Sequence, residues 1–194
     1  MTTRAQSKLR EIPEYLIYEM DEGKPIYYRG YEDVLAGRKA PEAIMGESTL
    51  QSWLKTQIIV FLSKVLDENR YVSVAGELGL LLSKKTFRAA DISIFTKENF
   101  HLSNEYAKLP PEIVIEIDTK AHIEEQEHPA MHYFHRKTQQ LFDFGVQRVI
   151  WIFTADQKVM FAEPNQDWII TDWHKPVLIL DDIYLNIKEL LNNP

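Results

Sequence analysis

The stretch "PPEIVIEIDTKA", Pro110 to Ala121, predicts a buried strand that carries ionisable side chains near its end. Strand side chains alternate between two faces, so Glu116 and Asp118 share one face with Val114, while the isoleucines of residues 113–117 occupy the other. An unpaired carboxylate inside a protein costs several kcal/mol, so a cation, hydrogen-bond donors or water must face these two acids. The nature of that partner separates an enzyme site from a strand end that simply reaches solvent.

The segments around this strand predict an α/β protein with a mixed sheet. A helix opens at Ser48, which forms a capping-box pattern with Gln51. A second helix follows in "HPAMHYFHRKTQQLFDFG", with Pro129 in its first turn and Gly145 as its cap. Strands are expected at 71–83, 91–95, 112–118, 146–153, 158–163 and 168–173, a hairpin around residues 21–24, and a terminal helix over 181–191.

Composition sets the broad class of the protein. With 194 residues, of which 45% are hydrophobic and 26% charged, the chain suits one globular domain with a sizeable core. It has no cysteine, which excludes disulfides and thiolate metal sites. The net charge of −7 argues against a protein that coats nucleic acid, but not against an enzyme with a local basic groove. Because the sequence contains neither a signal peptide nor an apolar run of membrane-spanning length, we expect a cytoplasmic protein without membrane association.

Two acids on neighbouring strands suggest a metal site. Asp91 begins the strand expected at 91–95 and Glu116 lies near the end of the next, so pairing of the two strands would bring both carboxylates to one end of the sheet. With the carbonyl of Ile117 and water they would form the oxygen site that Mg²⁺ uses when it also holds a phosphate. Such an ion polarises a phosphoryl oxygen and acidifies bound water, and a nearby lysine would offset charge on phosphorus. The alternative is that Asp91 is a turn residue and that Glu116 and Asp118 are solvated.

The order and spacing of several short motifs resemble the Uma-type family of candidate restriction endonucleases. These motifs are "AADISIF" with Asp91, "PPEIVIEID" with Glu116, and "RKTQQLFDFGVQRVIWI", in which Lys137 stands eight residues before Gly145. The opening "YLIYEMDEGKPIYY" is similar to the N-terminal hairpin of that family. The likeness implies a restriction-endonuclease-like, or PD-(D/E)XK, fold: a mixed β-sheet flanked by helices, with an N-terminal β-hairpin extension. It also implies hydrolysis of phosphodiester bonds in DNA with Mg²⁺ or Mn²⁺, with Asp91, Glu116 and Lys137 as the catalytic residues.

The sequence departs from the pattern of this superfamily at three positions. Ala90 replaces the proline before the aspartate, Asp118 stands where the Glu-x-Lys motif has its lysine, and Thr119 replaces a serine. The resemblance implies that the lysine has moved to the following helix as Lys137, and Lys120, just past the strand, is the other candidate. At ~100° per residue, Lys137 lies at the margin of the apolar face of its helix, from which a lysine can bury its stem and reach the end of the sheet. An ordinary snorkelling lysine, with its stem buried and its ammonium group in water, is the alternative.

Two further acids and four basic residues are weaker candidates. Glu77 interrupts an apolar strand and would add a third metal ligand, although a strand residue that faces solvent explains it equally well. Glu47, just before the helix cap, resembles an acid that some superfamily members place on their first helix, and a favourable helix dipole is the alternative. The basic residues expected to contact the nucleic-acid backbone, if they are not merely solvated, are Lys84, Lys85, Arg88 and Arg136.

Three histidines in "HPAMHYFH" offer a rival zinc site, because His-x-x-x-His on a helix can hold that ion. However, Pro129 suggests that His128 lies outside the regular turn, and no glutamate follows in the manner of a metalloprotease. The face that carries His128, His132 and His135 is also nearly opposite Lys137. A polar helix flank is therefore the better interpretation.

The sequence as a whole predicts a single domain over residues 1–194, with a hairpin extension at 1–40, a nuclease-like core at 41–160, and closing strands and a helix at 161–194. DNA is the expected partner, Mg²⁺ or Mn²⁺ the expected cofactor, and a homodimer would help a nuclease to cut both strands. The main alternative is a nuclease fold kept as a binding or assembly module with vestigial carboxylates. The acidic net charge and the altered Glu-x-Asp motif favour that alternative.

Overall fold

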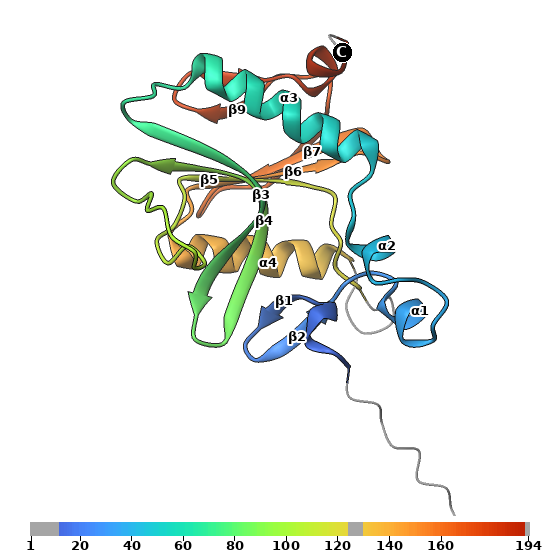
Figure 1. The fold of residues 1–194 in the computed structure, drawn as a ribbon. Coiled ribbons are helices and arrows are strands. Elements are labelled where there is room, and N and C mark those ends of the chain that lie inside the picture. The colour runs from blue at the N-terminus through green and yellow to red at the C-terminus, as the bar shows by residue number, and fades with distance from the viewer. Residues whose placement is uncertain (1–11, 124–129, 193–194) are drawn as a thin grey trace, which may run out of the picture.

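The computed structural model describes residues 12–123 and 130–192, in which helices cover both faces of a large β-sheet (Figure 1). The helices are η1 (Glu14–Leu16), α1 (Tyr31–Leu35), α2 (Glu42–Met45), α3 (Thr49–Val65), α4 (Ala130–Phe144) and α5 (Ile187–Leu191). The strands are β1 (Ile17–Asp21), β2 (Lys24–Tyr27), β3 (Tyr71–Ser83), β4 (Thr86–Thr96), β5 (Ile113–Ile117), β6 (Arg148–Phe153), β7 (Lys158–Ala162), β8 (Ile169–Asp172), β9 (Val177–Leu180) and β10 (Ile183–Leu185). None of the helices in the described ranges has both the length and the apolar character needed to cross a membrane.

Within these described residues, eight strands form one mixed sheet, and β9 and β10 form a separate pair. The order across the larger sheet is β2-β1-β4-β5-β6-β7-β8, with β3 also paired to β4. Strands β5 and β6 are parallel and are connected through α4, whereas the other pairs are antiparallel. The expected class, a mixed sheet flanked by helices with an N-terminal hairpin, is therefore confirmed. The boundaries expected between 1–40, 41–160 and 161–194 stay a prediction.

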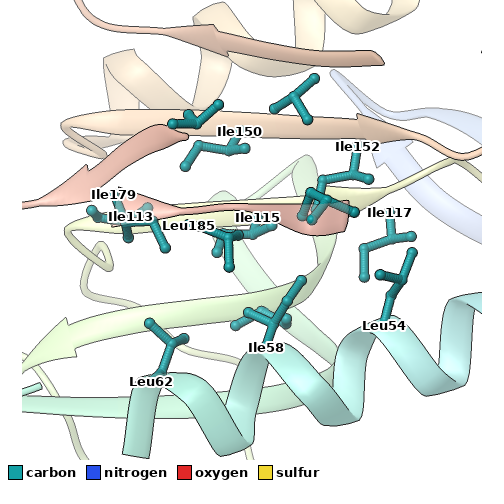
Figure 2. Close-up of a cluster of buried hydrophobic side chains, with 14 of the residues drawn as sticks. Leu54, Ile58, Leu62, Ile113, Ile115, Ile117, Ile150, Ile152, Ile179 and Leu185 are labelled. Carbon is teal, nitrogen blue, oxygen red and sulfur yellow. The ribbon is translucent and has the colours of Figure 1, made fainter. Parts of the chain in front are cut away.

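Branched aliphatic side chains on one face of the central strands pack against α3 (Figure 2). The alternation predicted for β5 is confirmed, because its three isoleucines face this cluster while Val114 belongs to the cluster on the opposite face. Full burial of one such side chain stabilises a fold by about 1.5–3 kcal/mol. The residues that fill the space between α3 and the sheet include Leu54, Ile58, Leu62, Ile113, Ile115, Ile117, Ile150 and Ile152, with Ile179 and Leu185 from the β9–β10 pair.

Aromatic side chains dominate the opposite face of the sheet, which α4 covers. Phe134 of α4 lies 4.7 Å from Trp151 of β6 between ring centres, in an edge-to-face arrangement. The indole nitrogen of Trp151 donates a hydrogen bond to the Thr138 hydroxyl at 3.0 Å, so the one polar atom of this ring is satisfied inside the core. These contacts fix the rotation of α4 about its axis and therefore decide where its polar residues point.

Local signals at both long helices match the structure. The capping box at the start of α3 is confirmed, because Ser48 Oγ accepts from Gln51 N–H and Gln51 Oε1 accepts from Ser48 N–H, each at 3.2 Å. Helix α4 ends before Gly145, whose φ of 122° is reached with little strain only by glycine. A Cβ atom at that position would also lie 2.8 Å from Pro110 Cγ. The predicted start of α4, at Pro129, lies outside the described residues.

The expectation that Asp91 begins a strand is wrong. Strand β4 starts at Thr86, directly after the turn at Lys84 and Lys85, so Asp91 lies in the middle of the strand. The reason is that β3 and β4 form one long hairpin whose register continues to the turn.

The expectation of a terminal helix over 181–191 is also wrong for the first half of that range. Asp181 adopts a left-handed turn with a φ of 50°, and residues 183–185 form β10. The helix starts only after Asn186, whose side chain accepts a hydrogen bond from Glu189 N–H at 3.3 Å. An N-cap at that position fixes the start of a helix.

Truncation of Ile58 tests the assignment of the α3 core face. Ile58→Ala should lower the free energy of unfolding by about 2–5 kcal/mol, because it leaves a cavity between α3 and the sheet. Val60, on the same helix, is 40% exposed, so Val60→Ala should have a much smaller effect. Urea denaturation of both variants measures the difference, and equal losses would contradict the assigned face.

Candidate functional site

The candidate site lies where one edge of β4 passes from one partner strand to another. Strand β3 pairs with the opposite edge along the length of β4, whereas this edge pairs with β1 at Phe87 and with β5 at residues 92–94. In the part of the chain that the structure describes, no strand pairs with residues 88–91 of this edge, which we call the junction. Backbone groups inside a protein must find other partners there, and charged side chains supply them.

Glu19 of β1 is the first charged side chain that fills the junction. It is completely buried, and its Oε1 accepts a hydrogen bond from Ala89 N–H at 3.1 Å. Its Oε2 accepts from Arg88 Nη1 at 2.8 Å and from the Tyr133 hydroxyl at 2.9 Å. Burial raises the pKa of Glu19, but the positive charges of Lys137 and Arg88 outweigh burial and hold that pKa below its usual value. Glu19 is therefore ionised at neutral pH.

Lys137 of α4 lies beside Glu19 and is 0% exposed. Its Nζ donates to the carbonyl of Ala89 at 2.7 Å, and lies 2.8 Å from Glu19 Oε1 and 3.0 Å from Glu116 Oε1. Burial lowers the pKa of Lys137, but the charges of Glu116 and Glu19 outweigh burial and raise it. The sequence predicts this lysine at the margin of the apolar face, and the structure places it wholly inside the protein.

Glu116 of β5 is only 1% exposed and shares Lys137 with Glu19. Its Oε1 lies within ion-pair distance of Lys137 but makes no hydrogen bond among the described residues. Burial raises the pKa of Glu116 to about 8 against the opposing charge of Lys137, and the charges of Asp91 and Glu19 add to the increase. This carboxyl group consequently holds a proton at neutral pH far more readily than a solvated glutamate does.

Asp91 lies at the other end of the junction and contacts α3. Its Oδ2 accepts a hydrogen bond from Ile117 N–H at 2.8 Å, and its Oδ1 lies 2.8 Å from Lys55 Nζ. The Lys55 ammonium also contacts Glu47, and the charges of both acids raise its pKa although burial lowers it. The β4–β5 register therefore places Asp91 and Glu116 at neighbouring positions, but a different lysine binds each. These lysines come from α3 and α4, which cover opposite faces of the sheet (Figure 1).

Further charged residues line the site toward solvent. Lys120 contacts the Glu77 carboxylate, lies 3.6 Å from Glu47 Oε1, and donates to the carbonyl of Met45 at 3.0 Å. Glu77 is part of a bulge in β3 that begins at Gly76, whose φ is 138°. Bulges of this kind re-aim a side chain. The two acids considered weaker candidates, Glu47 and Glu77, thus meet at Lys120, and Glu47 also shares Lys55 with Asp91.

Two positions at the end of β5 have different surroundings from each other. The carbonyl of Ile117 accepts a hydrogen bond from Gln51 Nε2 at 2.9 Å, and a carbonyl oxygen retains a second lone pair. Asp118 has a left-handed φ of 57°, and its carboxylate accepts from Thr154 N–H at 2.9 Å and Thr154 Oγ1 at 2.7 Å. The expectation that Asp118 shares the face of Glu116 is therefore wrong, because the turned backbone directs it to the end of β6.

The basic residues expected to contact nucleic acid lie in different environments. Arg88 is 1% exposed and is bound inside the junction, so the expectation that it contacts nucleic acid is wrong for this arrangement. Lys84 and Lys85 are exposed in the β3–β4 turn, but at 3.3 Å per residue they lie about 20 Å along β4 from Asp91. Arg136 is partly exposed and pairs with acids of the β1–β2 turn.

The zinc hypothesis gains no support from the described residues. His128 lies outside them, and His135 stacks on Trp168 with ring centres 4.9 Å apart. Across residues 12–123 and 130–192, no three histidine, aspartate or glutamate side chains gather closely enough to hold a metal ion by themselves. A polar flank of α4 remains the better interpretation of His132 and His135.

Sequence reasoning missed three residues of the site: Glu19, Lys55 and Tyr133. Glu19 stands between Tyr18 and Met20 in a strand of an apparently peripheral hairpin, and Lys55 occupies a polar position of α3. Apart from Glu47, which precedes Lys55 by eight residues, their charged partners are far away in the sequence, so local periodicity carries no signal for these contacts. The only available hint was the hydrophobic context of Glu19, in which an acid needs a partner.

Comparison with known proteins supports the fold. No family model matches the sequence, and no curated protein matches it. A solved structure from Anabaena variabilis, described as a candidate nuclease belonging to DUF820, aligns over 90% of this chain and 89% of that chain. The TM-score is 0.64 and the sequence identity is 18%. At this identity the likeness shows a shared fold.

Removal of Glu19 tests whether the junction depends on it. Glu19→Ala leaves the buried cations Arg88 and Lys137 without a shared anion, and breaking a buried pair in this way costs about 3–5 kcal/mol. The free energy of unfolding, measured with urea, should fall by that amount. Glu14→Ala, at an exposed position of η1, should have almost no effect. A loss below 1 kcal/mol for Glu19→Ala would show that the network does not hold the strands together.

The raised pKa of Glu116 predicts how stability depends on pH. Between the pKa of an unfolded glutamate, about 4.3, and about 8, the native state keeps a proton that the unfolded state releases, so Glu116 reduces stability as pH rises. Glu116→Gln removes this loss, so its stability relative to the natural protein should increase from pH 5 to pH 8. Urea unfolding at several pH values measures the trend. A pH-independent difference would mean that Glu116 titrates as an ordinary carboxylate.

Proposed function

We propose that the chain is a nuclease of the restriction-endonuclease-like, PD-(D/E)XK type, related to the Uma-type family, and that it hydrolyses phosphodiester bonds in DNA. The observation that carries the proposal is the juxtaposition of Asp91 and Glu116 on paired strands, with lysines bound to both. The fold shared with a candidate nuclease supports the same function. The likeness of the motifs around Asp91, Glu116 and Lys137 to that family supplies the reaction type.

The donor set around Asp91 fits Mg²⁺ or Mn²⁺. Asp91 and Glu47 offer carboxylates that both contact one ammonium group, and the Ile117 carbonyl lies on the residue whose N–H binds Asp91. Mg²⁺ is commonly held by one or two carboxylates, waters and substrate phosphate, without a full cage of side chains. When bound, such an ion polarises the phosphoryl oxygen and acidifies a water molecule. We propose Asp91, Glu47 and the Ile117 carbonyl as its ligands. This set departs from the expected Asp91, Glu116 and Ile117, because Glu116 is only 1% exposed and is paired with Lys137.

The remaining residues take roles that follow from their exposure. Lys137 is completely buried, so we assign it to positioning: it balances and orients Glu116 instead of contacting phosphate. Glu116, with its raised pKa, can hold a proton at its carboxyl group beside the site. Lys120 has a 13% exposed side chain and lies among Glu47 and Glu77, so it can bind a phosphate oxygen at the entrance.

One observation favours a second candidate function, a binding or assembly module that does not cleave. Asp91, Glu47 and Glu77 are each paired with a lysine, and Glu116 lies inside the core. A protein that has lost catalysis could keep such pairs for stability alone. In that case the chain would bind nucleic acid, or a partner protein, through other surfaces.

Cleavage assays with matched variants separate the two functions. The natural protein should nick or cut single-stranded or double-stranded DNA in the presence of Mg²⁺ or Mn²⁺. Asp91→Asn should reduce the rate by about 10²-fold or more, a typical cost of removing one electrostatic contributor from a catalytic site. Gel or fluorescence assays over defined substrates measure the rate. Asp143→Asn, at an exposed position of α4, should leave the rate unchanged.

The outcomes have distinct meanings. Cleavage that persists in Asp91→Asn points to a contaminating nuclease and contradicts the proposed site. DNA binding without cleavage, across varied substrates and both metals, supports the non-catalytic module. Circular dichroism of the variant provides the folding control.

A further inference from the structure

Lys55 occupies a position between two carboxylates that are fixed by other bonds. Its Nζ contacts Glu47 Oε1 and lies 2.8 Å from Asp91 Oδ1. The second oxygen of each acid is bound elsewhere: Glu47 Oε2 accepts from the Ser52 hydroxyl at 3.2 Å, and Asp91 Oδ2 accepts from Ile117 N–H at 2.8 Å. Both carboxylates therefore keep their orientation without Lys55, and one oxygen of each faces the same point.

The charges around this point do not balance. Glu47 and Asp91 together carry −2, and Lys55 supplies +1. Lys120 Nζ lies 3.6 Å from Glu47 Oε1, but it is in direct contact with Glu77, so its positive charge is mainly neutralised by the Glu77 carboxylate. Three acids and two lysines leave a net charge of −1 (−3 + 2). A divalent cation in place of the Lys55 ammonium would neutralise the Glu47–Asp91 pair.

The Lys55 side chain is buried, but it lies nearer to solvent than that of Lys137, with 10% of its area exposed against 1%. Its ammonium group makes its ion pairs with Glu47 and Asp91 outside the aromatic cluster. A lysine is a flexible chain with a strongly hydrated ammonium group, so a short rotation brings that group to water. Neighbouring Leu54 and Ile58 stay in the core whichever way the lysine points.

We propose that Lys55 is the built-in counter-ion of the metal site and competes with divalent cations for Glu47 and Asp91. The ammonium group holds the two acids in place while no metal is bound, and the ion enters only when Lys55 moves out. This inference rests on the proposed function in one respect, namely that Glu47 and Asp91 are the ligands. It makes Lys55 a determinant of metal affinity, separate from any role in cleavage.

Calorimetric titration with Mn²⁺ tests the competition directly. Lys55→Met removes the competing charge and leaves Glu47 and Asp91 facing each other, so it should lower the Kd for Mn²⁺ at least about tenfold relative to the natural protein. Lys64→Met, at an exposed position of the same helix, should leave the Kd unchanged. Adding Asp91→Asn to Lys55→Met should abolish the gain. Mn²⁺ should also raise the Tm of Lys55→Met more than that of the natural protein.

A measurement on the natural protein covers the case in which Lys55→Met does not fold. Amine acylation followed by mass spectrometry reports how accessible Lys55 is, and saturating Mg²⁺ should increase its labelling rate several-fold while leaving that of Lys64 unchanged. Lys55→Gln offers a second, more conservative variant for the titration.

The results distinguish this inference from the proposed function. Equal or weaker Mn²⁺ binding by Lys55→Met, or Lys55 labelling that is unaffected by metal, would overturn the competition even if the natural protein cleaves DNA. Tighter Mn²⁺ binding by Lys55→Met, together with no DNA cleavage by the natural protein, would support the competition by Lys55 and contradict the proposed nuclease function. If neither protein binds Mn²⁺ or Mg²⁺, both proposals fail.

Discussion

The structure depends on how a gap in β-pairing is filled. One edge of β4 changes partner from β1 to β5, and the backbone of Ala89 between them is bound by side chains: Glu19 accepts from its N–H, and Lys137 donates to its carbonyl. An open strand edge inside a protein would otherwise leave polar groups unsatisfied. The two opposite charges also compensate each other inside the protein, with Arg88 as a further partner of Glu19 and Glu116 as a further partner of Lys137. The N-terminal hairpin is thereby tied to α4.

The use of charged side chains to fill the gap in β-pairing also explains why such residues concentrate at the junction in an otherwise apolar fold. The isoleucine cluster under α3 (Figure 2) and the aromatic cluster over α4 exclude water from both faces of the central strands. Ionic interactions strengthen in such surroundings, and so does the cost of any unpaired charge. Glu116 shows the result, since its position beside a lysine does not prevent burial from raising its pKa to about 8. Altered ionisation of this kind arises at functional sites and in structural networks alike.

Sequence patterns predicted the parts of the fold that depend on local order. The capping box at Ser48, the full extent of β3 and the alternation of β5 follow from spacing, and the structure confirms them. The hairpin that carries Glu19 was also expected, but its contact with Lys137 was not, because 118 residues separate the two (137 − 19). The prediction that Asp118 shares a face with Glu116 failed for another reason. Strand periodicity assumes an extended backbone, and the left-handed φ of Asp118 ends that periodicity one residue after β5. Of the lysines that bind the candidate acids, Lys137 and Lys120 were predicted from the sequence, whereas Lys55 was not.

The three lysines near the acids differ in what they can do, and exposure is the property that separates them. Lys137 is enclosed by two carboxylates, a carbonyl and the Trp151 ring, so moving it would expose buried charge and open the junction. The side chains of Lys55 and Lys120 are 10% and 13% exposed, so their ammonium groups lie nearer to solvent, where the proposed exchange of a carboxylate for water or phosphate would take place. The buried Glu19–Lys137 pair therefore holds the strands and α4 together. Because this pair does not depend on Lys55 or Lys120, the proposed movement of these two outer lysines would leave the fold intact.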